Sequence, residues 1–436
     1  MLSPLSLMRM LIVADDLSGA ADCAIPCAAA GLETLVALGE AAGVALATDV
    51  LALDADTRRL TPAQAAIETE ALFRKFGQAG QVWFKKFDST LRGNIGAELA
   101  AALSAQREWA PDAFAVVAPA FPAADRQTRG GHQYLKGVPV EETDVWKREG
   151  MTGHAHVPSL LEKAGLRATH IPLADVRGGR AALSAALARA STTYDALVCD
   201  AETDEDLQAV AMAAAALAQN VLWAGAAGLA RHLPLAVGLR GVSPIATVQP
   251  PARGPILFVV GSMSGVSQGQ VDCLTKTGEV RRLMISPALL RAGGEGAGWH
   301  AALQELDTVL SSGQDIVVQL GHEDHIDTGE GLAFCHGLSK LVAPFAAKIG
   351  GLVSTGGETA RAVLVAFGAV GLRLIGEIEP GVPLSITEGG AHGLCHLPVI
   401  TKAGAFGQPD TLVRCRAVLR QPALLNRPTD FAKLRG

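Results

Sequence analysis

The sequence predicts an α/β protein with two domains, each a largely parallel sheet with helices on both faces. Two observations lead to this fold class. Short apolar runs alternate with Ala- and Leu-rich runs of helical period along nearly the whole chain, which is typical of βαβ units. The length of 436 residues also exceeds that of one ordinary domain.

The first series of elements predicts an N-terminal domain over residues 1–241. Apolar runs predict strands at 10–15, 34–38, 50–56, 82–88, 114–119 and 196–200. Helical periodicity predicts helices at 19–31, 63–77, 95–106 and 204–218. Residues 242–255 contain four prolines and a glycine, so we interpret them as a linker.

A second series predicts a C-terminal domain over residues 256–436. Strands are expected at 256–261, 315–321 and 351–357, and helices at 299–313 and 358–368. With two domains of this kind, we expect the active site in the cleft between them.

Composition excludes several classes of partner. The formal net charge is -6 and aromatic residues are 4% of the chain, so we expect neither nucleic acid nor an anionic membrane as a partner. No apolar stretch approaches the roughly 18 residues of a membrane helix. The seven cysteines include no CxxC pair, which favours free thiols in a cytoplasmic protein over a metal site.

Polar residues gather where predicted strands turn into helices, which is where open α/β sheets bind ligands. Asp15 and Asp16 follow the first strand, and burying two adjacent carboxylates is costly unless they are solvated, paired or used. Helix capping by Asp16 or Ser18 would explain only one of these groups. The turn at 54–60 holds Arg58 and Arg59, and it fits a capped surface turn as well as a site.

The third such turn is KKFDSTLRGN, residues 85–94. Its arginine offers a bidentate fork for a carboxylate or phosphate, and the helix that follows offers free N–H groups to an anion. Together these groups indicate a small polar, anionic ligand. After the next strand, residues 118–137 are expected to form an irregular segment that carries Arg126 and His132.

The predicted C-terminal domain has glycine-rich turns instead. GSMSGVS (261–267), STGGETARAVL (354–364) and TKAGAFG (401–407) each lie at or near the end of an apolar run. Turns of this kind present backbone N–H groups to phosphates. The chain has no GxGxxG with a downstream acid and no GxxxxGK[ST], so it lacks the motifs of Rossmann and P-loop sites.

Six of these motifs occur in the order found in the four-carbon acid sugar kinase family, formerly a domain of unknown function, which the chain resembles from about Leu11 to about Cys415. The motifs are VADDLSGAAD, KKFDSTLRGN, APAFPAADRQTRGGHQYL, GSMSGVSQGQV, STGGETARAVL and KAGAFG. The resemblance implies a kinase that transfers phosphate from ATP to the terminal 4-hydroxyl of a four-carbon sugar acid. D-threonate, D-erythronate and 3-oxo-tetronate are the substrates that it implies.

The resemblance also implies where the ligands bind. The sugar acid would lie on the N-terminal domain and ATP on the C-terminal domain. For the sugar-acid site it implies Asp16, Asp88, Ser89 and Arg92, to which the polar turns add Asp15, Lys86 and Arg126 as candidates. For the nucleotide it implies Ser262, Gly356, Gly357, Glu358, Thr359 and Gly404, and the first glycine-rich turn adds Ser264 as a candidate.

We assign roles to these residues as a hypothesis. Arg92, helped by Lys86 and Ser89, holds the substrate carboxylate and hydroxyls. Asp16, or alternatively Asp88, orients and deprotonates the accepting hydroxyl, and Asp16 is preferred because it ends the first strand. Mg²⁺ is expected on the phosphate oxygens of ATP, and no protein metal ligand is assigned.

One segment departs from the family pattern, and rival functions stay open. Residues 135–161 lack the Arg-Asp-Pro type stretch of the family, which leaves the particular sugar acid undecided. A phosphatase of the haloacid-dehalogenase kind would need DxDx[TV], and the chain has only DDLSG and DADT. A ribokinase-type enzyme would need a late Gly-Ala-Gly-Asp turn. A non-catalytic sugar-acid or nucleotide sensor, and a homo-oligomeric state, both remain open.

Overall fold

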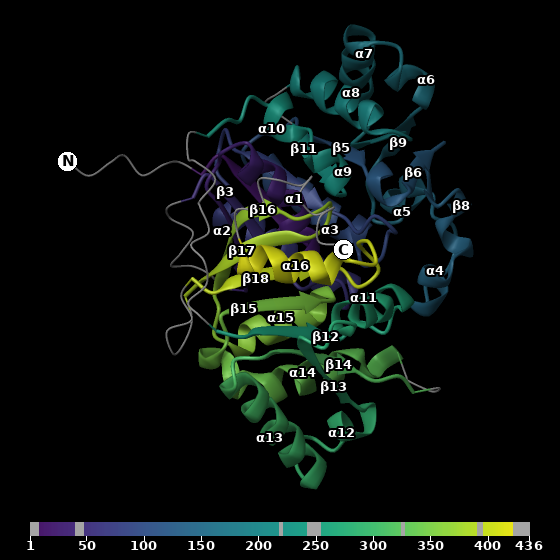
Figure 1. Cartoon of the computed structure of the whole chain (residues 1–436). Helices are drawn as coiled ribbons and strands as arrows, with labels where there is room; N and C mark the ends of the chain where they lie inside the picture. Colours follow the sequence, from purple (N-terminus) through teal and green to yellow (C-terminus); the bar gives the residue numbers. More distant parts are fainter. Residues whose placement is uncertain are drawn as a thin grey trace, which may run out of the picture. The chain divides into compact units, whose positions relative to one another are not determined.

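The computed structural model of the chain describes residues 8–39, 48–217, 221–241, 254–323, 328–389 and 396–421. These residues divide into two compact α/β units, the first reaching residue 241 and the second beginning at residue 254 (Figure 1). The predicted linker, 242–255, lies outside the described residues except for its last two. Within the described ranges, no helix is both long and apolar enough to cross a membrane.

The first unit is built on a parallel sheet with the strand order β2-β3-β1-β4-β11-β5-β10-β9. Its strands are β1 (Met10–Ala14), β2 (Thr34–Leu38), β3 (Val50–Asp54), β4 (Val82–Lys86), β5 (Phe114–Ala118), β9 (Ala168–Ile171), β10 (Ala196–Cys199) and β11 (Val221–Gly225). Strands β1, β2, β3 and β5 are buried along their whole length, which explains their uninterrupted apolar sequences.

The helices of the first unit cover both faces of this sheet. They are α1 (Leu17–Ala29), α2 (Pro62–Phe76), α3 (Ile95–Arg107), α4 (Asp144–Arg148), α5 (Val157–Glu162), α6 (Leu173–Val176), α7 (Arg180–Ser191), α8 (Asp204–Ala215), α9 (Ala227–Ala230) and α10 (Leu233–Ala236). The connection from β1 to β2 runs one way along the sheet, and those from β3 to β4 and from β4 to β5 run the other way. Because such crossovers are right-handed, α1 lies on one face and α2 and α3 lie on the other.

This reversal of direction creates a switch point at the carboxyl ends of β1 and β4. The chain leaves β1 toward one edge of the sheet and leaves β4 toward the other. A crevice forms where the connections from two neighbouring strands leave in opposite directions, and open α/β sheets bind their ligands there. The turns that hold Asp15, Asp16 and Asp88 therefore flank the position where the topology favours a site.

The segment predicted to be irregular, 118–137, is largely ordered as an antiparallel sheet, so this prediction was wrong. Strands β6 (Arg126–Arg129), β7 (His132–Leu135) and β8 (Val138–Pro139) pair in sequence. The β6–β7 turn consists of Gly130 and Gly131, with φ of 57° and 74°. A two-residue turn with positive φ at both positions is the common hairpin connection, so the Gly-Gly pair was a strand signal as well as a loop signal.

The second unit has the strand order β13-β14-β12-β15-β18-β17-β16, with β17 antiparallel to both of its neighbours. Its strands are β12 (Ile256–Val260), β13 (Val280–Ile285), β14 (Asp315–Leu320), β15 (Gly351–Thr355), β16 (Gly371–Glu377), β17 (Pro383–Glu388) and β18 (Pro398–Lys402). Its helices are α11 (Gly265–Thr275), α12 (Pro287–Arg291), α13 (Ala297–Ser311), α14 (Gly331–Val342), α15 (Gly357–Ala366) and α16 (Thr411–Arg420).

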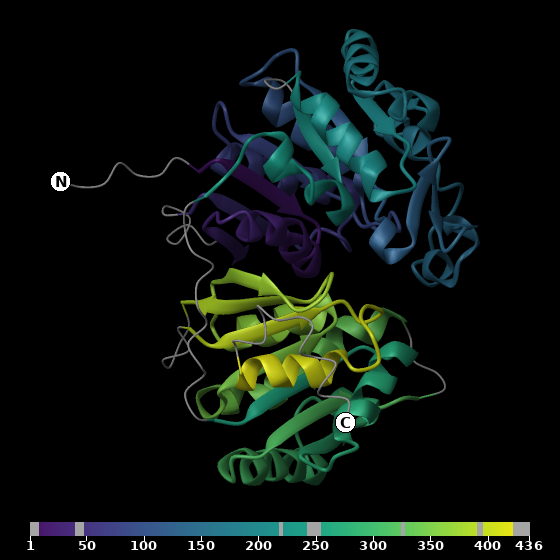
Figure 2. The ribbon, with the colours of Figure 1, turned by 45° about the horizontal axis from the view of Figure 1, so that its top comes forward.

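The second unit repeats the switch-point arrangement. The chain leaves β12 toward β13, whereas β14 crosses over to β15 in the opposite direction, so β12 and β15 flank the reversal. A core cluster joins alternate residues of the central strands to α11 and α16, which cover one face of the sheet. Figure 2 shows α16, in yellow, lying along the strands of this unit. The glycine-rich turns after β12 and β15 thus follow the strands at the switch point.

Candidate active site

The carboxyl ends of β1, β3 and β4 bring together a polar cluster of alternating charge. The cluster consists of Asp15, Asp16, Arg58, Lys86, Asp88 and Arg92, three carboxylates and three cations. Register explains why they meet, because Ala14 pairs with both Asp54 and Lys86 in the parallel sheet. The three turns that follow these residues therefore leave the sheet at the same level.

Arg58 is the residue that connects the cluster. Its guanidinium lies 2.7 Å from Asp15 and 3.0 Å from Asp16, and 3.7 Å from Asp88. Burial alone would lower the pKa of Arg58, but the three carboxylates raise it well above its usual value. The sequence had left Arg58 balanced between a surface turn and a site, and the structure brings it into the cluster. Arg58 is marked by its position after β3, a strand that pairs with β1. This pairing is known only from the order of strands in the sheet.

Asp15 and Lys86 form the buried base of the cluster. Lys86 Nζ lies 3.3 Å from Asp15 and 3.5 Å from Asp16. Burial would raise the pKa of Asp15, but Arg58 and Lys86 hold it below its usual range. Lys86 approaches α1 so closely that a Cβ on Gly19 would lie 2.1 Å from its Nζ. This close approach explains the glycine in the first turn of α1. Asp15 and Lys86 are both buried, so they lie beneath the other residues of the cluster and support them.

Asp88 and Arg92 form a bidentate ion pair within one turn of chain. Arg92 Nε and Nη2 donate to the two oxygens of Asp88 at 3.0 and 2.8 Å. Asp88 also accepts the backbone N–H groups of Thr90 and Arg92. Burial would raise the pKa of Asp88, but Arg92 and Arg58 hold it well below its usual value. The Nε and Nη2 groups of Arg92 are thus already paired with Asp88, so a substrate would meet the remaining nitrogen, Nη1.

Asp16 differs from the other two carboxylates of the cluster. Its Oδ1 caps α1 by accepting the N–H of Gly19 at 2.9 Å, and the same oxygen faces Arg58 and Lys86. No hydrogen bond to its Oδ2 occurs among the described residues, and its side chain is 20% exposed, against 3% for Asp15 and 9% for Asp88. Asp16 therefore serves as a helix cap and still presents one free carboxylate oxygen at the switch point.

The antiparallel hairpin after β5 supports the turn that carries Asp88. Gln133 in β7 is fully buried, and its Nε2 donates to the carbonyl oxygens of Ser89 at 2.8 Å and Pro119 at 3.2 Å. Arg126 at the start of β6 is half-buried, and the charges of Asp88 and Arg92 both influence its pKa, which burial lowers. The sequence missed Gln133, since a lone glutamine in a strand carries no recognisable signal.

The departing segment, 135–161, also reaches the cluster. Glu149 follows α4, and its carboxylate lies 3.7 Å from Arg92 Nη1. The ring of His132, by contrast, lies against that of His156, with centroids 4.6 Å apart and planes tilted by 42°, and among the described residues no hydrogen bond or ion pair joins either histidine to the cluster. The departing segment therefore places a carboxylate beside Arg92.

In the second unit, three neighbouring parallel strands place the glycine-rich turns side by side. These strands are β12, β15 and β18. The carbonyl oxygen of Gly404 accepts the hydroxyls of Ser264 and Ser267, both at 2.8 Å. A Cβ on Gly404 would lie 2.1 Å from Ser262 Oγ, so this turn packs against the first one only because residue 404 lacks a side chain.

The GGET turn begins a helix that has no side-chain cap at its N-cap residue. Gly356, with φ of 94°, precedes α15 and provides no side-chain cap, and its own N–H donates to the carbonyl of Lys402 at 2.8 Å. An uncapped helix N-terminus offers N–H groups to an anion. Thr359 is buried, and a Cβ on Gly261 would lie 2.0 Å from its Oγ1. The Thr359 side chain therefore packs the first two turns together rather than facing solvent.

Lys402 is a buried cation beneath these turns. Its Nζ donates to the carbonyl oxygens of Ala403 at 3.1 Å and Gly404 at 3.5 Å. Burial lowers its pKa to about 8. The sequence indicated a lysine near the third turn but not its burial at the end of a central strand.

No group of three or more His, Cys, Asp or Glu side chains that could hold a metal ion occurs in the described ranges. Five cysteines, Cys23, Cys27, Cys199, Cys335 and Cys415, are buried free thiols, and Cys273 is half-buried. Cys395 lies outside the described residues.

Comparison with known proteins agrees with this division of chemistry. A model of a sugar-binding N-terminal domain matches residues 10–233, and a model of a nucleotide-binding C-terminal domain matches residues 257–412. A D-threonate kinase of Cupriavidus necator is 44% identical over 93% of this chain and 96% of its own length. A D-erythronate kinase of Heliobacterium modesticaldum is 28% identical over 93% of this chain and 96% of its own.

A solved structure from Salmonella typhimurium LT2, described as a putative tRNA synthase, shares the fold. Its TM-score is 0.76 at 22% identity, and the match covers 94% of this chain and 99% of that one.

Proposed function

Since the chain belongs to the four-carbon acid sugar kinase family and is a kinase of four-carbon sugar acids, we propose that it transfers the terminal phosphoryl group of ATP to the 4-hydroxyl of D-threonate. The choice of acid rests on similarity, because the D-threonate kinase is 44% identical and the D-erythronate kinase 28%. The choice of ATP rests on the match to a nucleotide-binding domain.

The free oxygen of Asp16 is the observation that carries the mechanism. Both carboxylate oxygens of Asp15 and of Asp88 pair with cations. Asp16 Oδ2, by contrast, accepts no hydrogen bond among the described residues. A catalytic carboxylate must reach the hydroxyl whose proton it accepts. Asp16 accepts that proton, and Arg58, 3.0 Å away, fixes the carboxylate in place.

The remaining cluster residues position the sugar acid. Arg92 Nη1 and the half-buried Ser89 are the groups left to meet the sugar acid, and Nη1 meets one of its hydroxyls. Asp88 holds the Arg92 guanidinium in one orientation, since a bidentate pair fixes both the plane and the direction of the fork. Asp15 and Lys86 act through Arg58 and Asp16 and do not touch the substrate.

The second unit holds the nucleotide mainly through backbone groups. The uncapped start of α15, at Gly357, donates backbone N–H to the phosphates, and Ser262 and Gly404 shape the adjoining turns. Met263, 39% exposed beside these turns, offers apolar area to the base. Mg²⁺ would enter with ATP, on its phosphate oxygens, and would there offset negative charge on the transferring group.

ADP release with Mg²⁺ tests the proposal directly, measured against D- and L-threonate, D- and L-erythronate and their 3-oxo forms. We expect turnover on D-threonate at least about tenfold above the other acids, since a missing hydrogen bond at a polar site costs that much or more. Preference for another member would replace D-threonate. Phosphate release from a sugar-acid phosphate without nucleotide would favour the phosphatase alternative, and ligand-shifted melting without turnover would favour the sensor.

A further inference from the structure

Asn94 stands where the turn that carries Asp88 and Arg92 meets the turn that carries Arg58. It is the residue immediately before α3, the N-cap position, where an asparagine side chain usually accepts an N–H from the first turn of the helix. Here the side chain makes no such bond. The amide of this asparagine therefore has another use, and its partners lie on the neighbouring turn.

The Asn94 amide binds that turn on both sides of Arg58. Its Nδ2 donates to the carbonyl oxygen of Leu60 at 2.9 Å and to that of Thr57 at 3.3 Å. The carbonyl of Thr57 also accepts the N–H of Leu60 at 3.0 Å, so this short turn is closed on itself and is held from outside by one side chain. Because Arg58 lies between the two accepting residues, its backbone is fixed relative to the start of α3.

Gly93 brings the backbone close to the Arg58 side chain at the same place. Its φ of 85° is in the left-handed region that favours glycine. A Cβ on Gly93 would lie 3.5 Å from both Arg58 Cγ and Asp15 Oδ2, so only the space of one methyl group separates Gly93 from these atoms. The Gly-Asn pair that ends KKFDSTLRGN thus adjoins both the side chain and the backbone of Arg58.

The reach of Arg58 to two carboxylates depends on where its backbone is held. Its guanidinium lies 2.7 Å from Asp15 and 3.0 Å from Asp16, the carboxylate to which we assign proton acceptance. Moving the turn by about 1 Å would take the second contact out of hydrogen-bond range. A misplacement of that size can cost about a hundredfold in rate.

We propose that Asn94 is a positioning residue for phosphoryl transfer: it fixes the turn that carries Arg58, and Arg58 places the Asp16 carboxylate against the accepting hydroxyl. Asn94 itself does not touch the substrate. This inference rests on the proposed role of Asp16 as the proton acceptor, and it adds to the site an uncharged side chain that acts only on the backbone of another turn.

ADP release with D-threonate and Mg²⁺ by variants of the full chain tests this role. Asn94→Asp keeps the size of the side chain and its ability to cap α3, but it replaces the Nδ2 donor by an oxygen. Asn94→Ala removes the donor without adding a charge. Both should lower kcat about ten- to a hundredfold and change the KM for sugar acid and nucleotide by less than about threefold. Urea titration of each variant shows that it is folded at the assay temperature.

A double-variant cycle shows whether the effect passes through Arg58. Arg58→Lys keeps a cation beside the buried Asp15 but loses the planar fork that also reaches Asp16, so it should itself lower kcat. Adding Asn94→Asp to this variant should then lower kcat by no more than about threefold further. A further loss as large as in the unmodified background, or an unchanged kcat in Arg58→Lys alone, would overturn the proposal, since Asn94 would act by another route.

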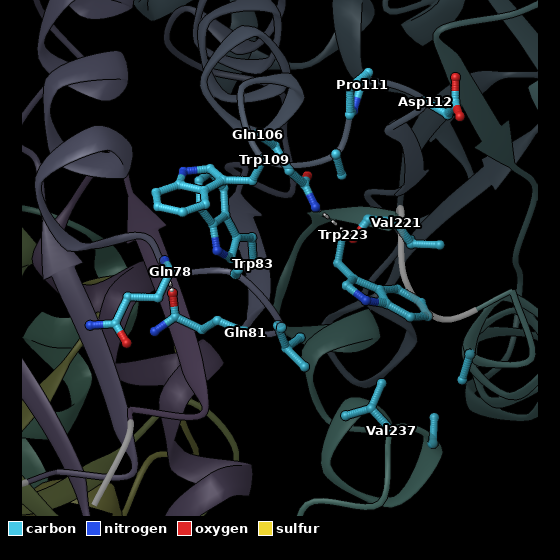
Figure 3. Close-up of a pocket in the computed structure, with 16 residues that line it drawn as sticks. Gln78, Gln81, Trp83, Gln106, Trp109, Pro111, Asp112, Val221, Trp223 and Val237 are labelled. Atoms are coloured by element: carbon cyan, nitrogen blue, oxygen red, sulfur yellow. Dashed lines mark hydrogen bonds between the residues drawn. The ribbon is translucent and has the colours of Figure 1, made fainter. Parts of the chain in front are cut away.

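Gln81→Glu is the matched control. Gln81, shown in Figure 3, lies just before β4, and its Nε2 donates to the carbonyl oxygen of Met8 at 3.2 Å, at the amino end of the sheet. The substitution makes the same change of amide to carboxylate and should leave kcat unchanged. An equal loss in Gln81→Glu, or a kcat of Asn94→Asp within about threefold of the unmodified protein, would overturn this inference alone. Absence of ADP release by the unmodified protein would overturn the proposed function together with it.

Discussion

Replacing Asp16 by asparagine separates its role as a proton acceptor from its role as a helix cap. The cap uses Oδ1, which accepts the N–H of Gly19 at 2.9 Å, and asparagine caps helices as well as aspartate does. Arg58 and Lys86 keep Asp15 as a partner, at 2.7 and 3.3 Å. Folding should therefore change by less than about 1 kcal/mol, a difference that a urea titration resolves.

The catalytic effect of Asp16→Asn should be much larger. A positioned general base contributes roughly 10²- to 10⁴-fold, or about 2.7–5.5 kcal/mol at 1.36 kcal/mol per tenfold. Because Asp16 alone among the cluster's carboxylates keeps a free oxygen, the loss should appear in kcat for ADP release, with nucleotide affinity unchanged.

Asp88→Asn provides the contrast, since it releases the fork of Arg92 and leaves Asp16 in place. This variant should mainly raise the KM for the sugar acid, through misplacement of Arg92. If Asp16→Asn retained a kcat within about threefold of the unmodified protein, proton acceptance would belong to another group and the reasoning from the free oxygen would be refuted.

Three further predictions concern residues around the two sites. Burial lowers the pKa of Lys402 to about 8 from 10.5, so the folded chain binds this proton less tightly than the unfolded chain. The free energy of unfolding measured by urea titration should therefore rise between pH 8 and 10.5, by up to about 1.4 kcal/mol per pH unit. Lys402→Met should flatten this rise. Gly404→Ala, whose Cβ would meet Ser262, should raise the nucleotide KM about tenfold or more and leave the sugar-acid KM alone; an unchanged nucleotide KM would contradict the packing of these turns. Gln133→Leu should destabilise the chain by about 1–3 kcal/mol and raise the sugar-acid KM, because the carbonyl of Ser89 loses its donor; a stability change without a KM change would limit Gln133 to the fold.

Most of the parallel strands were predictable because burial on both faces leaves an uninterrupted apolar run, although β9, β11 and β13 were not predicted. TLVAL and FAVVA are buried at every position and could hardly form anything else. The antiparallel strands escaped prediction for the opposite reason. Arg126–Arg129 is RQTR, with a single fully buried residue, and the hydrogen bonds that order it come from a partner strand and from Asp200, which accepts the N–H groups of Gly130 and Gly131.

The acidic residues of the candidate site could be predicted from the sequence, but the ion pairs that they form could not. Asp15, Asp16 and Asp88 lie next to apolar runs, so strand-end logic finds them. Arg58 stands four residues after β3, and nothing local distinguishes it from Arg59, which is exposed. Only the order β3-β1-β4 tells which arginine faces the carboxylates. Site composition is thus a local property of the chain, whereas pairing within the site depends on topology.

The pairing also decides what the sugar-acid site can discriminate. With the fork of Arg92 taken by Asp88, its Nη1 remains, and Glu149 stands 3.7 Å from that nitrogen. A substrate carboxylate that approached Nη1 would be repelled by the like charge of Glu149. A substrate hydroxyl at the same place would donate a hydrogen bond to the Glu149 carboxylate. Glu149 therefore favours the orientation in which a hydroxyl group lies against the departing segment. Glu149→Gln should relax that preference, reducing the ratio of kcat/KM between D-threonate and D-erythronate, and an unchanged ratio would assign the discrimination to other residues.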